Sequence, residues 1–354
     1  MAPIVIACGD HAGIGPEVAL KAVAAERLHD SSPGFVLVGD GQELTRLRTR
    51  FAFGMPWVPY RDPESPSNPA RPLSLPSHDT PVERPVEYLD LGNGADNEGN
   101  SESPESPNAG SGTARASLRY LTRAAQGCVR GEFAALVTAP VSKESILRCG
   151  VPFVGQTEFL ADLSHTPEVT MMLLGDDDRG RWLRVALVTT HLPLREVASS
   201  IRASEVARAI RHAADACRRL GLARARIGVA GLTPHAGDGG MLGDEEILTI
   251  QPAVAAARES GIDATGPIPG DTLFHQAFRG DYDAVVAMYH DQGLAPLKLV
   301  AFDRGVNWTL GLPFIRTSPD HGTAFDIAGK GIADPASMRA ALRMAAVLAG
   351  GAPA

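Results

Sequence analysis

The feature that most constrains this chain is the alternation of short apolar runs with segments of helical periodicity. The runs are nearly continuous in hydrophobicity and rich in β-branched residues, which is typical of strands covered on both faces. Strands are predicted at 4–7, 35–38, 134–138, 184–189, 226–230 and 284–288. Helices are predicted at 203–220, 245–260 and 336–348. This alternation predicts an α/β fold with a largely parallel sheet at its core.

The length of 354 residues is enough for two lobes. We expect one lobe to combine residues 1–133 with 300–354 and the other to span 134–299. Two stretches interrupt the strand–helix pattern. Residues 56–85 contain nine prolines, and residues 92–112 are rich in Gly, Asn, Ser, Glu and Pro. The second stretch is predicted to be a flexible surface insertion.

Composition excludes several classes of function. A net charge of -8 disfavours nucleic-acid binding, which needs clustered basic side chains. No apolar run approaches the roughly 20 residues that span a bilayer, so no membrane association is expected. The first apolar run is interpreted as a strand rather than a signal peptide. The four cysteines form no CxxC pair, which fits reduced thiols in the cytoplasm.

Three of the predicted strands run into a histidine, at His191, His235 and His290. Ligands of open α/β sheets bind beyond the carboxyl ends of the strands, so three imidazoles there could form a metal site. Such a site suits zinc or a neighbouring first-row ion and leaves a position open for substrate. Asp291 and Gln292 follow His290 and could orient its ring. Spacing alone does not decide between this site and ordinary hydrogen-bonded loop histidines.

A second cluster of polar residues lies among apolar segments shortly after His290. Lys298, Arg304, Asn307 and Arg316 suggest a local anion pocket, since Arg grips carboxylate or phosphate bidentately and Lys adds a point charge. Each cation taken alone is also compatible with a side chain that extends to solvent. The glycine loop at 9–17 is not GxGxxG, so a standard Rossmann dinucleotide site is not predicted.

Several motifs together resemble the 4-hydroxythreonine-4-phosphate dehydrogenase family of vitamin B6 synthesis. The resemblance covers nearly the whole chain outside the two interrupting stretches. It is carried by Ala-Gly-Ile-Gly-Pro at 12–16, Ala-Leu-Val-Thr-Ala-Pro at 135–140 with Lys143, and Thr-Thr-His-Leu-Pro-Leu at 189–194. It continues through Pro-His-Ala-Gly at 234–237, Met-Tyr-His-Asp-Gln-Gly at 288–293, Gly-Val-Asn at 305–307 and Arg-Thr-Ser-Pro-Asp-His-Gly at 316–322.

The resemblance implies a two-lobed isocitrate/isopropylmalate dehydrogenase-like fold and a metal-requiring alcohol dehydrogenase. The implied reaction is NAD-dependent oxidation of 4-phosphooxy-L-threonine to 2-amino-3-oxo-4-phosphooxybutanoate, which decarboxylates to 3-amino-2-oxopropyl phosphate. NADP is the alternative cofactor. The metal, zinc with cobalt or magnesium as alternatives, would be held by His191, His235 and His290. One of these ligands would come from the partner subunit, which implies a homodimer with its active site at the subunit interface.

The resemblance also implies the other site residues. Substrate contacts correspond to Gln156, Thr157, Lys298, Asn307 and Arg316. Lys298 and Asp271 are the candidates for removing the proton from the substrate alcohol, and the sequence does not choose between them. The cofactor loop corresponds to His321, Gly322, Thr323, Ala324, Asp326 and Gly329.

One departure from the family affects this assignment. The family motif usually reads Gly-His-Thr-Glu, and here Gln156 stands in place of the histidine. Gln can donate a hydrogen bond but cannot carry a proton at neutral pH. The rival interpretations keep the fold and change the substrate to a phosphorylated sugar acid (4-phosphoerythronate or threonate) or a dihydrodiol. More remote alternatives are a metal-dependent hydrolase and a non-catalytic sensor.

Overall fold

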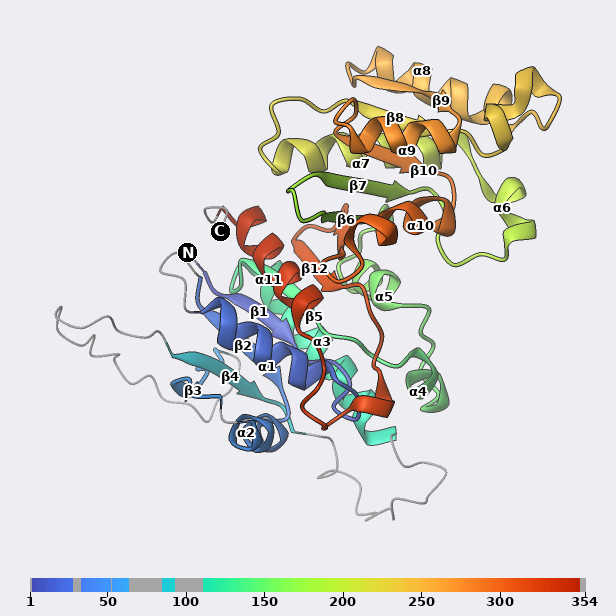
Figure 1. The fold of residues 1–354 in the computed structure, drawn as a ribbon. Helices are drawn as coiled ribbons and strands as arrows, with labels where there is room; N and C mark the ends of the chain where they lie inside the picture. The colour runs from blue at the N-terminus through green and yellow to red at the C-terminus, as the bar shows by residue number, and fades with distance from the viewer. Residues whose placement is uncertain (1, 28–32, 52, 64–84, 93–110, 351–354) are drawn as a thin grey trace. The chain divides into compact units, whose positions relative to one another are not determined.

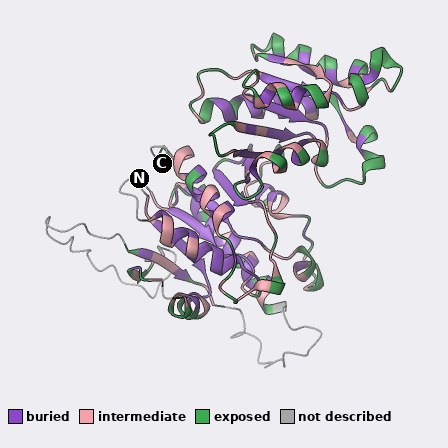
Figure 2. Ribbon diagram, in the orientation of Figure 1, coloured by how far each residue is buried: buried purple, intermediate pink, exposed green. Residues whose placement is uncertain are grey.

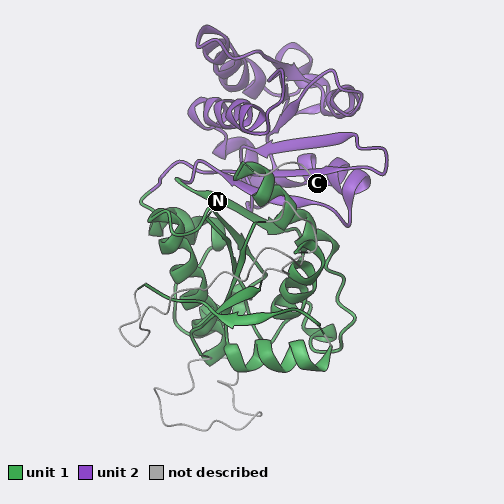
Figure 3. Cartoon of the chain, turned by 90° about the vertical axis from the view of Figure 1, so that its left-hand side faces the viewer, with its two compact units in different colours: residues 1–165, 313–354 green, residues 166–312 purple. Residues whose placement is uncertain are grey.

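The structure is a computed structural model that describes residues 2–27, 33–51, 53–63, 85–92 and 111–350. Most of the proline-rich stretch 56–85 and of the predicted insertion 92–112 lies outside the described residues. The chain divides into two compact units (Figure 3). Unit 1 comprises Met1–His165 and Pro313–Ala354, and unit 2 comprises Thr166–Leu312.

Unit 1 is built on a parallel sheet with the strand order β3-β4-β2-β1-β5-β12 (Figure 1). Its strands are β1 (Ile4–Ala7), β2 (Phe35–Gly39), β3 (Trp57–Pro59), β4 (Val86–Asp90), β5 (Ala135–Thr138) and β12 (Ile315–Pro319). Its helices are α1 (Gly15–Glu26), α2 (Gly41–Arg50), α3 (Ser111–Val129), α4 (Lys143–Arg148), α5 (Gln156–Leu163) and α11 (Ala336–Leu348), with a 3-10 turn η4 at Phe325–Ile327.

The local sequence explains how these elements begin. Strands β1, β2 and β5 are buried along their whole length, as their unbroken apolar runs predict (Figure 2). Helix α1 has Pro16 in its first turn, where a missing N–H costs nothing. Helix α2 is capped by the Asp40 carboxylate, which accepts from the Glu43 N–H at 2.8 Å.

Unit 2 contains a mixed sheet with the strand order β11-β6-β7-β10-β8-β9. Strand β6 pairs antiparallel with β11 and β7, whereas β7, β10, β8 and β9 are mutually parallel. The strands are β6 (Thr170–Asp176), β7 (Trp182–Leu187), β8 (Ile227–Ala230), β9 (Ala264–Ile268), β10 (Ala284–Ala287) and β11 (Val306–Leu310). The helical elements are α6 (Leu194–Ser200), α7 (Ala203–Arg219), η2 (Pro234–Gly240), η3 (Glu246–Ile250), α8 (Gln251–Glu259), α9 (Gly270–Phe278) and α10 (His290–Ala301).

The predicted α/β class with a largely parallel sheet is confirmed, and the six predicted strands coincide with β1, β2, β5, β7, β8 and β10. Six further strands of the described residues were not predicted, and β12 and β9 show why. Strand β12 is buried but contains the polar residues Arg316, Thr317 and Ser318, so its sequence shows no apolar run. Strand β9 contains a glycine and a proline, which disfavour strands in general. The predicted helix 245–260 begins with a π-helical turn before α8.

The division into units differs from the predicted lobe boundaries. Residues 134–165 lie in unit 1 because β5 pairs with both β1 and β12. Residues 300–312 lie in unit 2 because β11 pairs with β6. Both unit boundaries therefore depend on which strands pair with each other. The hydrophobic periodicity of the sequence does not predict pairing between strands that are distant in sequence. None of the helices in the described ranges has the length and apolar character needed to cross a membrane.

Helix α10 offers a test of how unit 2 is held together. Leu297 is fully buried in a core cluster with strands β7 and β10, whereas Leu299 on the same helix is 89% exposed. Leu297→Ala is expected to lower the free energy of unfolding of unit 2 by about 2–5 kcal/mol, through lost burial and the cavity left behind. Leu299→Ala is the matched control, with an expected change within about 0.5 kcal/mol. Urea unfolding measures both, and similar losses for the two variants would contradict this packing.

Candidate active site

The three predicted metal ligands follow three neighbouring strands of unit 2. Strands β7, β10 and β8 are adjacent and parallel, so their carboxyl ends lie at the same edge of the sheet. Backbone pairing continues beyond β7 and β10: Val188 donates to Ala287 at 2.9 Å and Thr189 to Met288 at 3.2 Å. The segments that carry His191 and His290 are therefore held beside each other.

His191 and His290 come together within one chain, with their ring centroids 5.6 Å apart. Two imidazoles that bind one tetrahedral ion through bonds of about 2.0–2.1 Å would have centroids roughly 5 Å apart, so the spacing fits a shared ion. The His290 Nδ1 lies 2.7 Å from the Asp291 carboxylate, which leaves Nε2 to face an ion. This carboxylate–histidine pairing is the usual support of a metal-binding histidine.

His235 lies in the turn after β8 and has the same kind of support. Its Nδ1 is 3.2 Å from an Asp238 carboxylate oxygen, and its side chain is 69% exposed. Within the described ranges, no group of three or more His, Cys, Asp or Glu side chains is arranged to hold a metal ion. One chain thus brings His191 and His290 together without His235, and the convergence of all three remains a prediction.

The other predicted residues of unit 2 are spread over three elements. Lys298 lies in α10, with its ammonium 5.2 Å from the centre of the Phe302 ring. Asn307 lies in β11, and its Oδ1 is buried without a hydrogen-bond partner among the described residues. Asp271 lies in the first turn of α9, is exposed, and accepts from the Thr272 N–H at 2.7 Å. An orphaned buried oxygen such as that of Asn307 suits a ligand contact.

Unit 1 contains a buried cation at Arg316. The residue is 3% exposed, and its guanidinium donates to Thr138 Oγ1 at 2.7 Å and to Gln156 Oε1 at 2.9 Å. Burial lowers the pKa of Arg316 to about 10, and the charge of Glu158 acts in the opposite direction. The group is therefore still cationic at neutral pH. A buried guanidinium that donates to the neutral oxygens of Thr138 and Gln156 is suited to binding an anion.

Gln156 bridges two strands through its side-chain amide. Its Oε1 accepts from Arg316 in β12, and its Nε2 donates to the carbonyl of Ala139, just after β5, at 3.0 Å. Thr157, the next residue in α5, is buried. A pocket in unit 1 is lined by Thr138, Pro140, Val141, Lys143, Phe153, Gly155, Gln156, Ser318, Pro319, His321 and Gly322. Gln156 thus both supports Arg316 and lines this pocket.

Thr138 and Lys143 were not predicted as site residues. Their positions in the sequence could have identified them. Thr138 ends a predicted strand of a parallel sheet and Lys143 follows shortly after it, and ligands bind beyond such strand ends. The predicted cofactor residue His321 lines the same pocket, and its Nε2 is buried with no hydrogen-bond partner in the described part of the chain. That nitrogen could bond to a ligand in the pocket.

The predicted cofactor loop packs on the glycine loop after β1. Thr323 accepts from the Ile14 N–H at 2.9 Å, and a Cβ at Gly13 would lie 2.7 Å from the Thr323 carbonyl oxygen. Ala324 is left-handed, with φ 42°. Asp326 is exposed, and Gly329 also has a positive φ of 67°. Gly13 is therefore explained by close backbone packing, and the loop's contacts with NAD remain a prediction.

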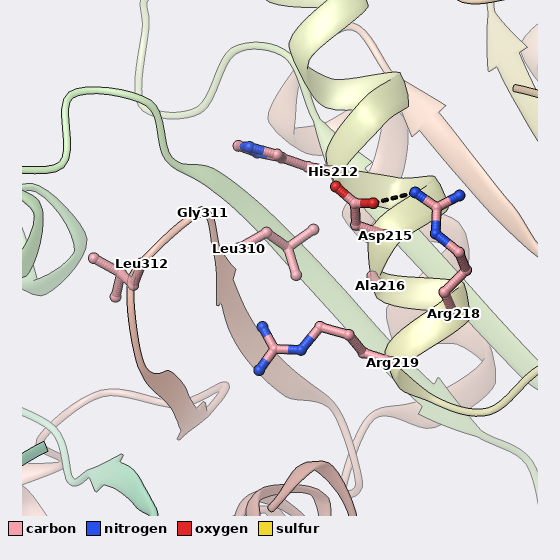
Figure 4. Close-up of a pocket in the computed structure, with 8 residues that line it drawn as sticks. All are labelled: His212, Asp215, Ala216, Arg218, Arg219, Leu310, Gly311 and Leu312. Carbon is pink, nitrogen blue, oxygen red and sulfur yellow. Dashed lines mark hydrogen bonds and ion pairs between the residues drawn. The ribbon is translucent and has the colours of Figure 1, made fainter. Parts of the chain in front are cut away.

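A second pocket, on helix α7 of unit 2, contains none of the predicted residues (Figure 4). Asp215 and Arg218 form an ion pair there, and the Arg219 guanidinium lies 5.6 Å from the centre of the Trp308 ring. His212 bonds to Thr170 Oγ1 at 2.9 Å, and burial, with the nearby charges of Arg211 and Arg208, lowers its pKa. These polar groups are occupied by one another and by the fold, so we place no site here.

Comparison with known proteins identifies the chain's relatives. The family described as pyridoxal phosphate biosynthetic protein PdxA matches residues 61–345. The chain belongs to this family. It is 45% identical over 341 residues to the 4-hydroxythreonine-4-phosphate dehydrogenase of Pseudomonas putida, covering 95% of this chain and 94% of the relative. The predicted family is therefore confirmed.

Solved structures support the same conclusion. The crystal structure of 4-hydroxythreonine-4-phosphate dehydrogenase from Klebsiella pneumoniae matches with a TM-score of 0.80 and 37% identity, over 99% of this chain and 100% of that one. A terephthalate 1,2-cis-dihydrodiol dehydrogenase from Burkholderia xenovorans matches with a TM-score of 0.63 and 28% identity, over 99% of this chain and 98% of that one. A β-decarboxylating dehydrogenase from Thermococcus kodakarensis, at 14% identity and a TM-score of 0.53, shares the fold alone. The predicted isocitrate/isopropylmalate dehydrogenase-like fold is confirmed.

The bridging role of Gln156 leads to a prediction about the histidine usual at this position. Gln156→His is expected to retain dehydrogenase activity at least equal to the parent, because a neutral imidazole also offers one donor and one acceptor. Gln156→Leu offers neither, and the loss of two partly buried hydrogen bonds is expected to cost about 1–3 kcal/mol of stability for each partner that loses its bond to residue 156. Initial rates and urea unfolding check both variants. A large loss of activity in Gln156→His would indicate adaptation to a different substrate.

Proposed function

We propose that this chain is an NAD-dependent 4-hydroxythreonine-4-phosphate dehydrogenase. It oxidises 4-phosphooxy-L-threonine to 2-amino-3-oxo-4-phosphooxybutanoate, which loses CO2 to give 3-amino-2-oxopropyl phosphate, in the synthesis of vitamin B6. The observation that carries the proposal is the nearly full-length identity of 45% to a protein of that name. The buried cation Arg316 suits the anionic groups of this substrate. NADP is the alternative cofactor.

The proposal includes a divalent metal, with zinc preferred over cobalt or magnesium. His191 and His290 would hold it, since their spacing and the support of Asp291 fit two neutral imidazoles on one ion. His235 completes the proposed set, with one of the three ligands supplied across the interface of a homodimer. When bound, the metal would act as a Lewis acid toward the substrate's hydroxyl and carbonyl oxygens.

The chain's own residues then bind substrate and move the proton. Arg316, supported by Gln156, would bind an anionic group, with Thr157, Lys298 and Asn307 as further proposed substrate contacts. Asp271 or Lys298 would take the hydroxyl proton. A carboxylate offers free lone pairs, whereas an ammonium must first lose a proton.

The proposed cofactor site is the loop that carries His321, Gly322, Thr323, Ala324, Asp326 and Gly329. NAD would supply the redox chemistry by accepting hydride, and the protein would supply its position. The Nε2 of His321 is buried and has no hydrogen-bond partner among the described residues, which supports a ligand contact in this loop. We place the enzyme in the cytoplasm, which is consistent with thiols rather than disulfides at Cys8, Cys128 and Cys217.

A substrate panel tests the proposed reaction. We expect NADH formation with 4-phosphooxy-L-threonine in the presence of zinc, cobalt or magnesium, and little with 4-phosphoerythronate or a dicarboxylate dihydrodiol. Gln156, which stands where the family usually has histidine, is the observation that favours these other substrates. A preference for either of them would be compatible with the same fold but would refute 4-phosphooxy-L-threonine as the substrate. Turnover of an ester without NAD would instead support a hydrolase.

The metal site is tested by removing one ligand. His235→Ala is expected to lose most of its bound zinc and its turnover, because two imidazoles hold zinc far less tightly than three. His275→Ala is the matched control, since this exposed histidine in α9 belongs to no predicted ligand set. Metal analysis of the purified variants measures the effect. Zinc content equal to that of the parent in His235→Ala would refute its role as a ligand.

A further inference from the structure

The turn that carries His235 has an unusual backbone, and we call residues 231–241 the His235 loop. His235, Ala236, Gly237, Asp238 and Gly239 are all left-handed, with φ between 43° and 85°. Residues with a Cβ rarely adopt this conformation singly and very rarely in succession. Such a backbone persists only where surrounding contacts determine it. The His235 loop therefore needs an anchor elsewhere in unit 2.

Glu246 supplies contacts of this kind. It opens the π-helical turn η3, is 1% exposed, and directs its carboxylate at the start of the His235 loop. Its Oε1 accepts from the Leu232 N–H at 2.8 Å, the Thr233 N–H at 2.8 Å and the Thr233 hydroxyl at 3.0 Å. Three donors on one carboxylate oxygen, all within two residues of Pro234, fix where the loop begins.

The His235 loop also folds closely around this carboxylate. A Cβ at Gly237 would lie 2.9 Å from Glu246 Oε2, and one at Gly231 would lie 3.1 Å from Oε1. Oε2 is buried and has no hydrogen-bond partner within the described ranges. The loop backbone is thus in contact with both carboxylate oxygens, and a side chain at either glycine would push it away.

Gln292 links the same loop to the segment that carries His290. Its Nε2 donates to the Gly231 carbonyl at 2.7 Å, and its Oε1 accepts from the Met288 N–H at 2.7 Å. Glu246 and Gln292 therefore hold neighbouring residues of one turn. The partly buried Gln292 thus ties the start of the His235 loop to the segment that carries His290, while the buried Glu246 ties it to η3.

We propose that Glu246 is a positioning residue for metal binding. Its carboxylate anchors the His235 loop in its left-handed conformation, and so sets the direction in which the His235 imidazole, held by Asp238, meets the metal ion. The inference rests on the proposed function, because it requires His235 to be a ligand. It goes beyond that function by assigning a role to Glu246, which would act through the His235 loop without touching the metal or the substrate.

The test compares two conservative variants in the full-length protein. Glu246→Asp keeps the charge but shortens the side chain, so its oxygen no longer reaches Leu232 and Thr233. It is expected to weaken zinc affinity by roughly 10–100-fold, the usual effect of removing a residue that supports a metal ligand. Glu246→Gln keeps an acceptor at the same reach and is expected to bind zinc more tightly than Glu246→Asp. Glu259→Gln, an exposed glutamate at the end of α8, is the control for lost charge.

Three readouts separate positioning from general stability. Zinc affinity is measured by competition with a chromophoric chelator, and the visible spectrum of the cobalt-loaded protein reports the geometry of the ligands. A purely structural role would lower the melting temperature and leave that spectrum unchanged, which would overturn the proposal. Parent-like zinc affinity in Glu246→Asp would also overturn it. If Glu246→Asp does not fold, amide hydrogen exchange is measured in the metal-free parent protein. Slow exchange of the Leu232 and Thr233 N–H groups is expected, because both donate to Glu246. Fast exchange would refute the proposed anchor.

The His235→Ala variant distinguishes this inference from the proposed function. If His235→Ala retains its zinc, the proposed metal site itself is wrong. If His235→Ala loses zinc while Glu246→Asp binds it as the parent does, the metal site stands and only the positioning role of Glu246 is wrong.

Discussion

The candidate metal site depends on the parallel pairing of β7, β10 and β8. Parallel neighbours end at the same edge of a sheet, so the segments that follow them meet whatever their separation in sequence. The pairing continues past β7 and β10 through Thr189 and Met288, which brings the rings of His191 and His290 to 5.6 Å. The buried apolar strands of unit 2 therefore have a chemical consequence, because they fix the positions of two candidate ligands.

In each unit, hydrogen bonds between side chains and loops hold the polar groups of the candidate site in place. In unit 1, Thr138 and Gln156 accept from the Arg316 guanidinium and hold a cation in a buried position. In unit 2, Glu246 and Gln292 hold the His235 loop. Each of these side chains follows or faces the carboxyl end of a strand, where the backbone leaves the sheet and its polar groups need partners.

The sequence predicted those features that are local or periodic. Buried strands such as β1 and β10 are apolar runs in the sequence and can be predicted from it. The histidines after β7, β8 and β10 can be predicted as candidate ligands because they follow such runs. Strand β12 was missed since it buries Arg316 and Thr317, whose burial depends on partners distant in sequence. Glu246 was missed for the same reason, because nothing near it in the sequence marks its carboxylate as buried. The bridging role of Gln156 likewise depends on Ala139 and Arg316.

The carboxylates beside two of the candidate ligands have a consequence for charge balance. Asp291 and Asp238 each accept from an imidazole, so two histidines bring two negative charges with them. Those charges equal the charge of a divalent cation, and the loaded centre would be close to electroneutral. A neutral centre would not offset the negative charge of a bound phosphate. Under the proposed function, that task would fall to the cationic side chains proposed to bind substrate and not to the metal.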